Sequence, residues 1–358
     1  MNTATCMACG WQRHKHHHET RRQNVSQRKE QSLEPLVSVI IPVYNVYPYL
    51  QEALDSVISQ IYQNLEILII DDGSNDGSEV VCDAYQQKDS RITVIHQENR
   101  GLGGARNTGL GIAKGELIAF LDSDDVYEPE TIRLLVEKLQ MNGADICICG
   151  YRHFYIQSDN TKTSTDTFSF NSEKQITSRE ALAELAQNTI NPAVWNKIYR
   201  RELWDGIRFS ESVFFEDICV MCKLLERART IQLIEDVLIR YRIHPDSITH
   251  MGTQKHIHDY IQAHDQYESH IRSNIPEIYN DRQYQQVQER HIDGLFILWS
   301  RQNRTDRITA KSLRREITRR IRGLKTEYLT TKTRIKYWTM CFCPGLFPVM
   351  LSVYRYIR

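Results

Sequence analysis

The segment LVSVIIPV, at Leu36–Val43, is a nearly unbroken run of β-branched and other apolar residues. Such a run is typical of a strand that is buried on both faces of a sheet. Amphipathic helical patterns, the first opening at Pro48, separate this segment from four similar runs, at Leu65–Ile70, Ile92–Ile95, Leu117–Leu121 and Asp145–Cys149. Strands that alternate with helices predict an α/β fold with a mostly parallel, Rossmann-like sheet flanked by helices.

The rest of the chain divides by composition. Residues 1–34 are polar and nearly free of aliphatic side chains, which predicts a disordered leader. We expect the α/β domain over residues 35–250, a helical C-terminal extension over 251–334, and an apolar amphipathic tail over 335–358. Residues 156–177 are rich in Ser, Thr, Asn and Asp and are expected to form a loop or insertion. The next helix, expected from Ser178, has no capping-box glutamate when Ser178 is taken as its cap.

Composition excludes several classes of protein. The 45 Lys and Arg residues balance 45 Asp and Glu residues, so no overall field attracts nucleic acid, and none is expected as a partner. The nine cysteines are scattered, and several lie in apolar segments, which indicates a reducing compartment. The first residues contain no secretory signal. We therefore expect a cytoplasmic protein.

The sequence Asp122-Ser123-Asp124-Asp125 directly follows a predicted strand. Ligands of open α/β sheets bind at the carboxyl ends of the strands. Carboxylates at such an end suit a hard divalent cation, with Mg²⁺ or Mn²⁺ held together with substrate phosphates. The alternative is a solvated turn that caps the following helix.

Two other strand ends carry polar residues that would reach the same crevice. Asp71-Asp72 follows the second strand, and a carboxylate there could accept hydrogen bonds from a nucleobase or a ribose. It could equally form a turn with the following glycine. Tyr44-Asn45 ends the first strand, where the tyrosine could stack on a base or simply close the sheet edge.

The segment NRGLGGARNTG, at Asn99–Gly109, is rich in glycine and contains Arg100 and Arg106. Close backbone approach and a guanidinium group suit a diphosphate. We expect a glycine-rich loop that continues as a helix to Gly115. The glycine spacing and position differ from a dinucleotide fingerprint, and no Walker A sequence is present, which argues against an NAD enzyme and a P-loop NTPase.

Two later segments contain charged groups that each allow two interpretations. Glu216-Asp217 opens a predicted helix, where the carboxylates form either a charged first turn or a general base. Arg242 and His244, after a strand-like run, could reach phosphates, but a polar loop is the simpler interpretation.

Taken together, these segments closely resemble family 2 glycosyltransferases with the GT-A fold, in the branch that makes capsules and exopolysaccharides. The resemblance extends from Leu36 to Thr249. Several motifs carry it in a fixed order: SVIIPVYN at Ser38–Asn45, IIDDGSNDGS at Ile69–Ser78, NRGLGGARNTG at Asn99–Gly109, FLDSDD at Phe120–Asp125, NKIYRRELW at Asn196–Trp204 and FFEDI at Phe214–Ile218.

The resemblance implies a nucleotide-sugar site at the ends of the first two strands. Pro42 and Tyr44 would line a pocket for a uridine-type base, with Asn45 next to them. Asp72 would hydrogen-bond the base, with Asp71 beside it.

It also implies a metal site. Asp122 and Asp124 would form a DXD-type pair that holds Mn²⁺ or Mg²⁺, with Asp124 the most direct ligand. Asp122, Ser123 and Arg106 would lie along the nucleotide-sugar.

The remaining implied roles concern the reacting groups. Asp217 would be the catalytic base. Trp195, Asn196, Lys197 and Glu216 would lie near the donor sugar and the acceptor.

The reaction that the resemblance implies is inverting transfer of a hexosyl residue from an NDP-sugar, with UDP expected, to a saccharide or polyprenyl-diphosphate-linked acceptor. A β-linked product in polysaccharide biosynthesis follows. Two alternatives are a catalytically silent sugar-nucleotide or glycan-binding protein and a nucleotidyltransferase. The presence of both Asp124 and Asp217 disfavours the first, and PVYN in place of a glycine-rich, basic loop after the first strand disfavours the second.

The two ends of the chain add further expectations. Residues 337–354 are uncharged and interrupted by proline and glycine, while residues 301–336 contain 13 Lys or Arg against three acidic residues. This pattern suits peripheral contact with an anionic membrane, at the inner face of the cell membrane, or a helix docked on the core. Near the N-terminus, Cys6, Cys9 and the histidines from His14 have poor spacing for zinc, so a disordered leader is the preferred interpretation.

Overall fold

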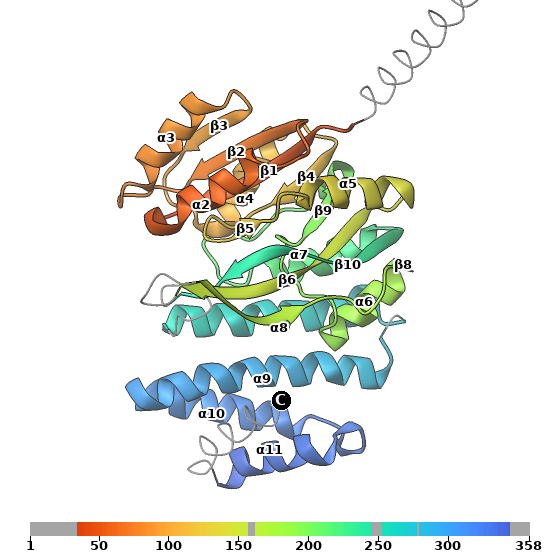
Figure 1. Cartoon of the computed structure of the whole chain (residues 1–358). Helices are drawn as coiled ribbons and strands as arrows, with labels where there is room; N and C mark the ends of the chain where they lie inside the picture. The colour runs from red at the N-terminus through yellow and green to blue at the C-terminus, as the bar shows by residue number, and fades with distance from the viewer. Residues whose placement is uncertain (1–33, 157–161, 245–252, 278, 344–358) are drawn as a thin grey trace, which may run out of the picture.

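The computed structural model describes residues 34–156, 162–244, 253–277 and 279–343. Ten strands form one mixed sheet in the order β3-β2-β1-β4-β9-β6-β10-β5, with β7 paired to β6 and β8 to β10 (Figure 1). The strands are β1 (Val37–Val43), β2 (Leu65–Asp71), β3 (Ile92–His96), β4 (Leu117–Phe120), β5 (Val126–Tyr127), β6 (Ile146–Ile156), β7 (Lys162–Phe168), β8 (Lys174–Thr177), β9 (Lys197–Arg200) and β10 (Thr230–Arg242).

The first four strands in that order are parallel, as the sequence predicts, because a crossover helix connects each of them to the next along the chain. Beyond β4 the sheet becomes mixed: β9 runs antiparallel to both β4 and β6, while β10 runs parallel to β6. The carboxyl ends of β1, β2 and β4 therefore lie along one edge, which is the edge where the predicted ligand residues begin.

Helices cover both faces of the sheet. Ile40 of β1 faces the layer of α4, α6 and α7, and Ile41 faces the layer of α2, α3 and α5. Gly109 lets α4 approach the sheet closely, since a Cβ there would lie 2.5 Å from a methyl carbon of Ile40. These helices are α2 (Tyr47–Ile58), α3 (Ser78–Lys88), α4 (Gly101–Ile112), α5 (Thr131–Met141), α6 (Ser178–Gln187) and α7 (Asp217–Arg227).

Three local predictions were wrong. Residues 156–177 are not a loop, because they contain β7 and β8, whose polar residues pair with β6 and β10. The glycine-rich segment is helical from Gly101 onward instead of starting as a loop. The cap of α6 is Thr177 and not Ser178, and Glu180 completes the capping box that the sequence interpretation had found missing.

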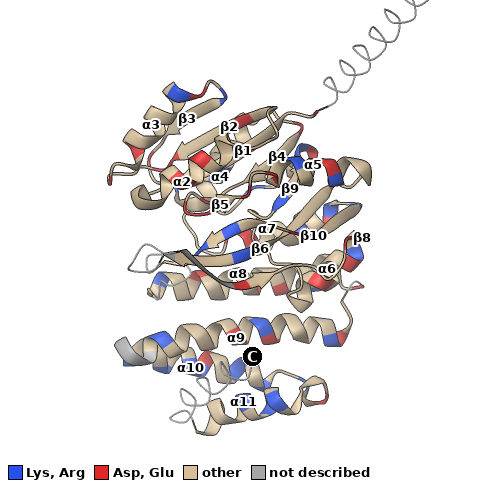
Figure 2. Cartoon of the chain, viewed as in Figure 1, with Lys and Arg blue, Asp and Glu red and all other residues tan. Residues whose placement is uncertain are grey.

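After β10 the chain is helical, with α8 (Gln254–Asn274), α9 (Asp281–Thr305), α10 (Arg307–Arg322) and α11 (Thr331–Phe342). Helix α8 packs against α7 and α9, and Figure 1 shows α9, α10 and α11 stacked beyond α8. Figure 2 shows Lys and Arg positions along α10 and α11. Within the described ranges, no helix is long and apolar enough to cross a membrane. The predicted leader with its Cys/His segment, except Glu34, and residues 344–358 of the predicted tail lie outside the described residues.

Candidate active site

The loop after β4 presents its carboxylates in alternation. Asp122 and Asp124 are partly exposed, while Ser123 and Asp125 are buried. Nε2 of His244 lies 2.9 Å from Oδ2 of Asp124, and the backbone N–H of Arg242 donates to Oδ1 of Asp125 at 2.8 Å. The end of β10 therefore holds this loop in place, although it comes more than a hundred residues later in the chain.

Arg106 joins three elements of the site. Its guanidinium group donates to Oδ1 of Asp122 at 2.7 Å and forms a second ion pair with Glu216. The side chain of Arg106 is only 3% exposed, so these contacts are made away from water. A single buried cation thus brings the β4 loop, helix α4 and the N-terminus of α7 together.

Asp217 is the first residue of α7 and directly follows Glu216. Burial raises the pKa of Asp217 above the usual aspartate value, while the nearby Arg106 and Lys197 oppose that rise. Burial likewise raises the pKa of Glu216 to about 7. A carboxylate with a raised pKa accepts protons more readily at neutral pH than an exposed one does.

Lys197 is fully buried on β9 and its charge acts on Asp217. Burial lowers its pKa to about 7. Its Nζ has three acceptors, namely the carbonyl groups of Asn191 and Ala193 and the side-chain oxygen of Asn196, at 2.9, 2.6 and 2.7 Å. Three acceptors match the three N–H bonds of an ammonium group. The geometry therefore fits the protonated form of Lys197.

Trp195 and Asn196 are buried beside Lys197. The indole ring of Trp195 stacks on Tyr241, with the ring centres 5.4 Å apart, and contacts Tyr151 edge-on. The side-chain amide of Asn196 donates to the carbonyl group of Cys149 at 2.8 Å. These contacts fix the segment against β6 and β10.

At the end of β2, both aspartates have partners within the protein. The two carboxylate oxygens of Asp71 contact the N–H of Ser74 at 3.0 Å and Nδ1 of His96 at 2.7 Å. Oδ1 of Asp72 accepts from the side chain of Gln97 at 2.6 Å and from the N–H of Arg100 at 2.9 Å. Asp71 thus organises the turn, and Asp72 anchors the start of α4.

The end of β1 is more open. Pro42 is buried, whereas Tyr44 is 50% exposed and Asn45 is also exposed. Asn45 adopts a left-handed backbone conformation with φ 50°, and its side chain accepts from the N–H of Asn75 at 2.9 Å. Tyr44 is therefore presented at the strand-end edge with a ring face available for stacking.

The β4 loop has the composition expected of a divalent-cation site. Asp122, Asp124 and Asp125 repel one another, and burial together with this repulsion raises the pKa of Asp125 well above its usual range. Oδ2 of Asp125 is buried and has no hydrogen-bond partner among the described residues. Oxygen ligands with surplus negative charge suit Mg²⁺ or Mn²⁺.

The structure adds residues that the sequence interpretation missed or set aside. Arg242 and His244, which had been assigned to a polar loop, contact Asp124 directly, with Nε of Arg242 2.7 Å from its carbonyl oxygen. Gln97 was not considered, although it follows β3 in the same way that Asp72 follows β2. Applying the strand-end rule to β3 and β10 would have identified these residues.

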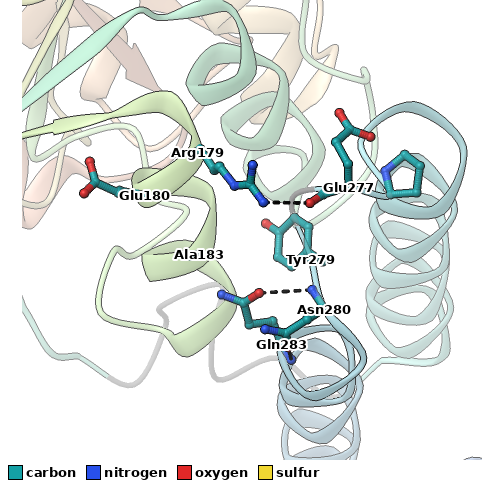
Figure 3. A pocket seen from close by; sticks show the side chains of 8 residues that line it. Arg179, Glu180, Ala183, Glu277, Tyr279, Asn280 and Gln283 are labelled. Atoms are coloured by element: carbon teal, nitrogen blue, oxygen red, sulfur yellow. Dashed lines mark hydrogen bonds between the residues drawn. The ribbon is translucent and has the colours of Figure 1, made fainter.

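A cavity of about 520 Å³ lies elsewhere, between α6 and the segment that leads into α9 (Figure 3). There the guanidinium group of Arg179 donates to the carbonyl group of Glu277 at 3.0 Å, and the N–H of Asn280 donates to the side chain of Gln283 at 3.1 Å. None of the predicted site residues lines this cavity.

Comparison with known proteins identifies the family. The model of glycosyl transferase family 2 matches residues 38–207. EpsJ of Bacillus subtilis, an uncharacterized glycosyltransferase, is 33% identical over 243 residues, which cover 66% of this chain and 69% of EpsJ. The chain belongs to glycosyltransferase family 2. Glycosyltransferase GlyG of Streptococcus pneumoniae is also 33% identical, over 60% of this glycosyltransferase and 73% of GlyG.

Solved structures agree with the predicted GT-A fold of this glycosyltransferase. TarS from S. aureus superposes with a TM-score of 0.64 at 19% identity, over 90% of this chain and 92% of that one. Its complex with UDP-GlcNAc superposes with a TM-score of 0.52 at 19% identity, over 72% and 81% of the two chains. The TarS match includes most of the C-terminal helices as well as the sheet. The prediction of a glycosyltransferase with this fold is therefore confirmed.

Proposed function

We propose that this glycosyltransferase moves a hexosyl residue from a UDP-sugar to a saccharide or lipid-linked saccharide, with inversion at the anomeric carbon. The proposal rests on the two ion pairs that Arg106 makes with Asp122 and Glu216. They link the candidate metal-binding loop to the helix that begins with Asp217. A leaving group and a general base must lie on opposite sides of one sugar carbon, and the two contacts of Arg106 support the assignment of both sets of groups to one site.

The candidate metal ligands are Asp122 and Asp124, which are the partly exposed members of the β4 loop. The unpartnered Oδ2 of Asp125 and the mutual repulsion of the three carboxylates support a cation at this loop. When bound, Mn²⁺ or Mg²⁺ supplies charge that offsets the negative charge on a departing diphosphate.

The protein groups act on the acceptor hydroxyl group and on the departing diphosphate. Asp217 accepts the proton of an acceptor hydroxyl group as its oxygen bonds to the anomeric carbon. The bond from that carbon to the diphosphate oxygen breaks on the opposite face, and UDP leaves with the bonding electron pair. An α-linked donor then gives a β-linked product. Arg106 holds Glu216 in place, and that contact fixes the start of α7.

The donor nucleotide is proposed from two observations. Tyr44 offers an exposed ring at the end of β1, where Pro42 and Asn45 complete the edge. TarS, which has the same fold, has been solved with UDP-GlcNAc and with UDP. In this chain Asp72 would contact the base with the part of its carboxylate that does not bind Gln97 and Arg100, and Ser123 would lie along the nucleotide-sugar. Asp71, whose two oxygens are engaged, would support the turn.

A donor panel tests this proposal. The protein is incubated with UDP- and GDP-sugars in the presence of Mn²⁺, and the release of nucleoside diphosphate is measured with and without a saccharide acceptor. We expect release from a UDP-sugar, loss of that release in EDTA, and a weakened Mn²⁺ dependence in Asp124→Asn. The coupling constant of the anomeric proton, measured by NMR, reports the product configuration. An α-linked product from an α-linked donor would contradict inversion.

We also propose peripheral membrane contact, which fits a polyprenyl-diphosphate-linked acceptor in polysaccharide assembly at the inner face of the cell membrane. One side of α11 presents Ile335, Trp338 and Phe342, which are 55, 58 and 70% exposed. They lie at helical spacing on a helix that follows the basic α10. The family resemblance is the support for the polysaccharide pathway.

Flotation with liposomes that contain anionic lipid tests the membrane proposal. Replacing Ile335, Trp338 and Phe342 with serine should lower the floated fraction without unfolding the protein, because all three are exposed. Met141→Ser on α5, where Met141 is 70% exposed, is the matched control. Equal flotation of the triple variant and the wild type would refute the proposal.

A further inference from the structure

The loop before Asp217 has a costly backbone conformation. Ser212 and Phe215 are not glycines, yet both have left-handed φ values, of 55° and 62°. Such conformations persist only where the surrounding structure holds them, and they concentrate at functional sites. Contacts from two helices hold residues 209–216 in this conformation.

Helix α4 holds one side of the loop. The N–H of Ser212 donates to the carbonyl group of Arg100 at 2.9 Å. The glycines of α4 allow this close approach, since a Cβ on Gly103 would lie 2.3 Å from the carbonyl oxygen of Ser210. Arg106 then holds Glu216 at the end of the loop. This side connects the loop to the nucleotide half of the site, because the N–H of Arg100 also binds Asp72.

Helix α8, from the C-terminal helices, holds the other side. Oδ2 of Asp259 accepts from the backbone N–H of Phe214 at 3.1 Å and pairs with Lys255. Nζ of Lys255 donates to the carbonyl group of Ser212 at 2.6 Å. The ring of Phe215 packs against His256 and Tyr260, with ring centres 4.8 and 5.0 Å apart. The two left-handed residues are therefore each contacted by α8.

The contacts that α8 makes with the loop are stabilised by burial and by packing against α9. Asp259 is only 5% exposed, so its bond to Phe214 is protected from water. The ring of Tyr260 lies against α9 at Gly294, where a Cβ would come within 1.8 Å of its hydroxyl oxygen. That hydroxyl group donates to the carbonyl group of His291 at 3.3 Å. Movement of α8 relative to the sheet would consequently displace the loop.

We propose that α8 positions the catalytic base, with Asp259 as the positioning residue that fixes the loop leading into Asp217. The inference rests on the proposed role of Asp217. It gives the C-terminal helices a part in the reaction, because they set the direction from which the base meets an acceptor hydroxyl group. Asp259 itself touches neither substrate in this account.

The experiment compares Asp259→Ala with Asp259→Asn in the full-length protein. Asparagine keeps an oxygen that can accept from the N–H of Phe214, whereas alanine removes it. We measure hydrogen exchange of the 209–217 segment, the kcat of transfer, and the affinity for UDP with Mn²⁺. In Asp259→Ala we expect faster exchange of this segment and a fall in kcat of about tenfold or more, with UDP affinity unchanged. Asp259→Asn should restore most of both losses.

Two controls on the same helix separate positioning from general destabilisation. Asp265→Ala removes the ion pair with Arg320, and Tyr267→Phe removes the buried contact with the hydroxyl group of Tyr279. Tyr267→Phe should lower the melting temperature, whereas Asp265→Ala, at a half-exposed ion pair, should change it little. Both variants should leave kcat and loop exchange near the wild-type values.

Each outcome decides whether Asp259 positions the loop that leads into Asp217. Unchanged exchange in Asp259→Ala would overturn the inference, and so would faster exchange with an unchanged kcat. An equal loss of kcat in the two controls would also overturn it, because α8 would then act through stability alone. If the wild type transferred no sugar, the proposed function would fail, and the exchange measurement would still decide whether Asp259 holds the loop.

Discussion

Replacement of Arg106 by methionine is the substitution that the structure predicts to be most damaging. Methionine keeps much of the apolar stem but leaves the carboxylates of Glu216 and Asp122 without their cation. The side chain of Glu216 is 5% exposed and that of Asp122 is 22% exposed, so the uncompensated charge on Glu216 dominates the cost. Breaking a buried ion pair by removing one partner costs about 3–5 kcal/mol.

The loss should also depend on pH. Without the guanidinium group, the pKa of Glu216 in the folded protein rises further above that of the unfolded chain. The folded variant then binds a proton that the unfolded chain has released, so its stability falls as pH rises towards the folded pKa. We therefore expect the deficit relative to the wild type to be larger at pH 8 than at pH 6.

Urea unfolding followed by circular dichroism at the two pH values measures this effect. Arg133→Met on α5 is the matched control, because Arg133 is 37% exposed and pairs with Glu130 and Glu137 at the surface. Such pairs contribute about 0–1 kcal/mol. A loss below about 1 kcal/mol for Arg106→Met at pH 8 would refute the reasoning, since surface pairs reach that value.

Three further predictions follow from local geometry. The raised pKa of Asp217 predicts that kcat/KM falls on the acid side of a pKa above the ordinary aspartate value, because the base must be deprotonated; a pH–rate profile measures this. Gly103→Ala should cost about 1–3 kcal/mol by thermal unfolding, because its Cβ meets the backbone of Ser210, whereas Gly111→Ala in the same helix meets nothing within 4 Å and should not destabilise. Thr177→Ala should cost about 0.5–2 kcal/mol in urea unfolding, through loss of the capping box of α6.

The parallel half of the fold was predictable because its signal is local. Runs such as Leu36–Val43 and Leu117–Leu121 are almost continuously apolar, and only a doubly covered sheet buries both faces of such strands. The rule that ligands bind at the carboxyl ends of parallel strands predicted that Asp122 and Asp72 would lie at one edge of the sheet. β7 and β8 were missed because they are polar, and their strand structure comes from pairing with β6 and β10. Thr177 was missed because the cap was assigned one residue too late, to Ser178.

The partners of the site residues depend on contacts that no local pattern contains. His244 meets Asp124, and Glu216 meets Arg106, across more than a hundred residues of chain. Sequence patterns identify which groups lie near a strand end, but they do not say which neighbour each group binds. The left-handed conformation of Phe215 also depends on a distant contact, because α8 holds it while the local sequence predicts only the start of a helix.

The most direct test of the account concerns Asp217 itself. Asp217→Asn keeps the size of the side chain and removes its ability to take a proton, so the kcat of transfer from a UDP-sugar should fall by roughly 10²–10⁴-fold. The affinity for UDP in the presence of Mn²⁺, measured by calorimetry, should stay within about twofold of the wild type. A twofold change is well below the tenfold change that 1.4 kcal/mol of binding free energy produces. A variant that keeps most of its transfer rate would contradict the assignment of the base. Loss of UDP binding in parallel with turnover would show that Asp217 shapes the donor site instead.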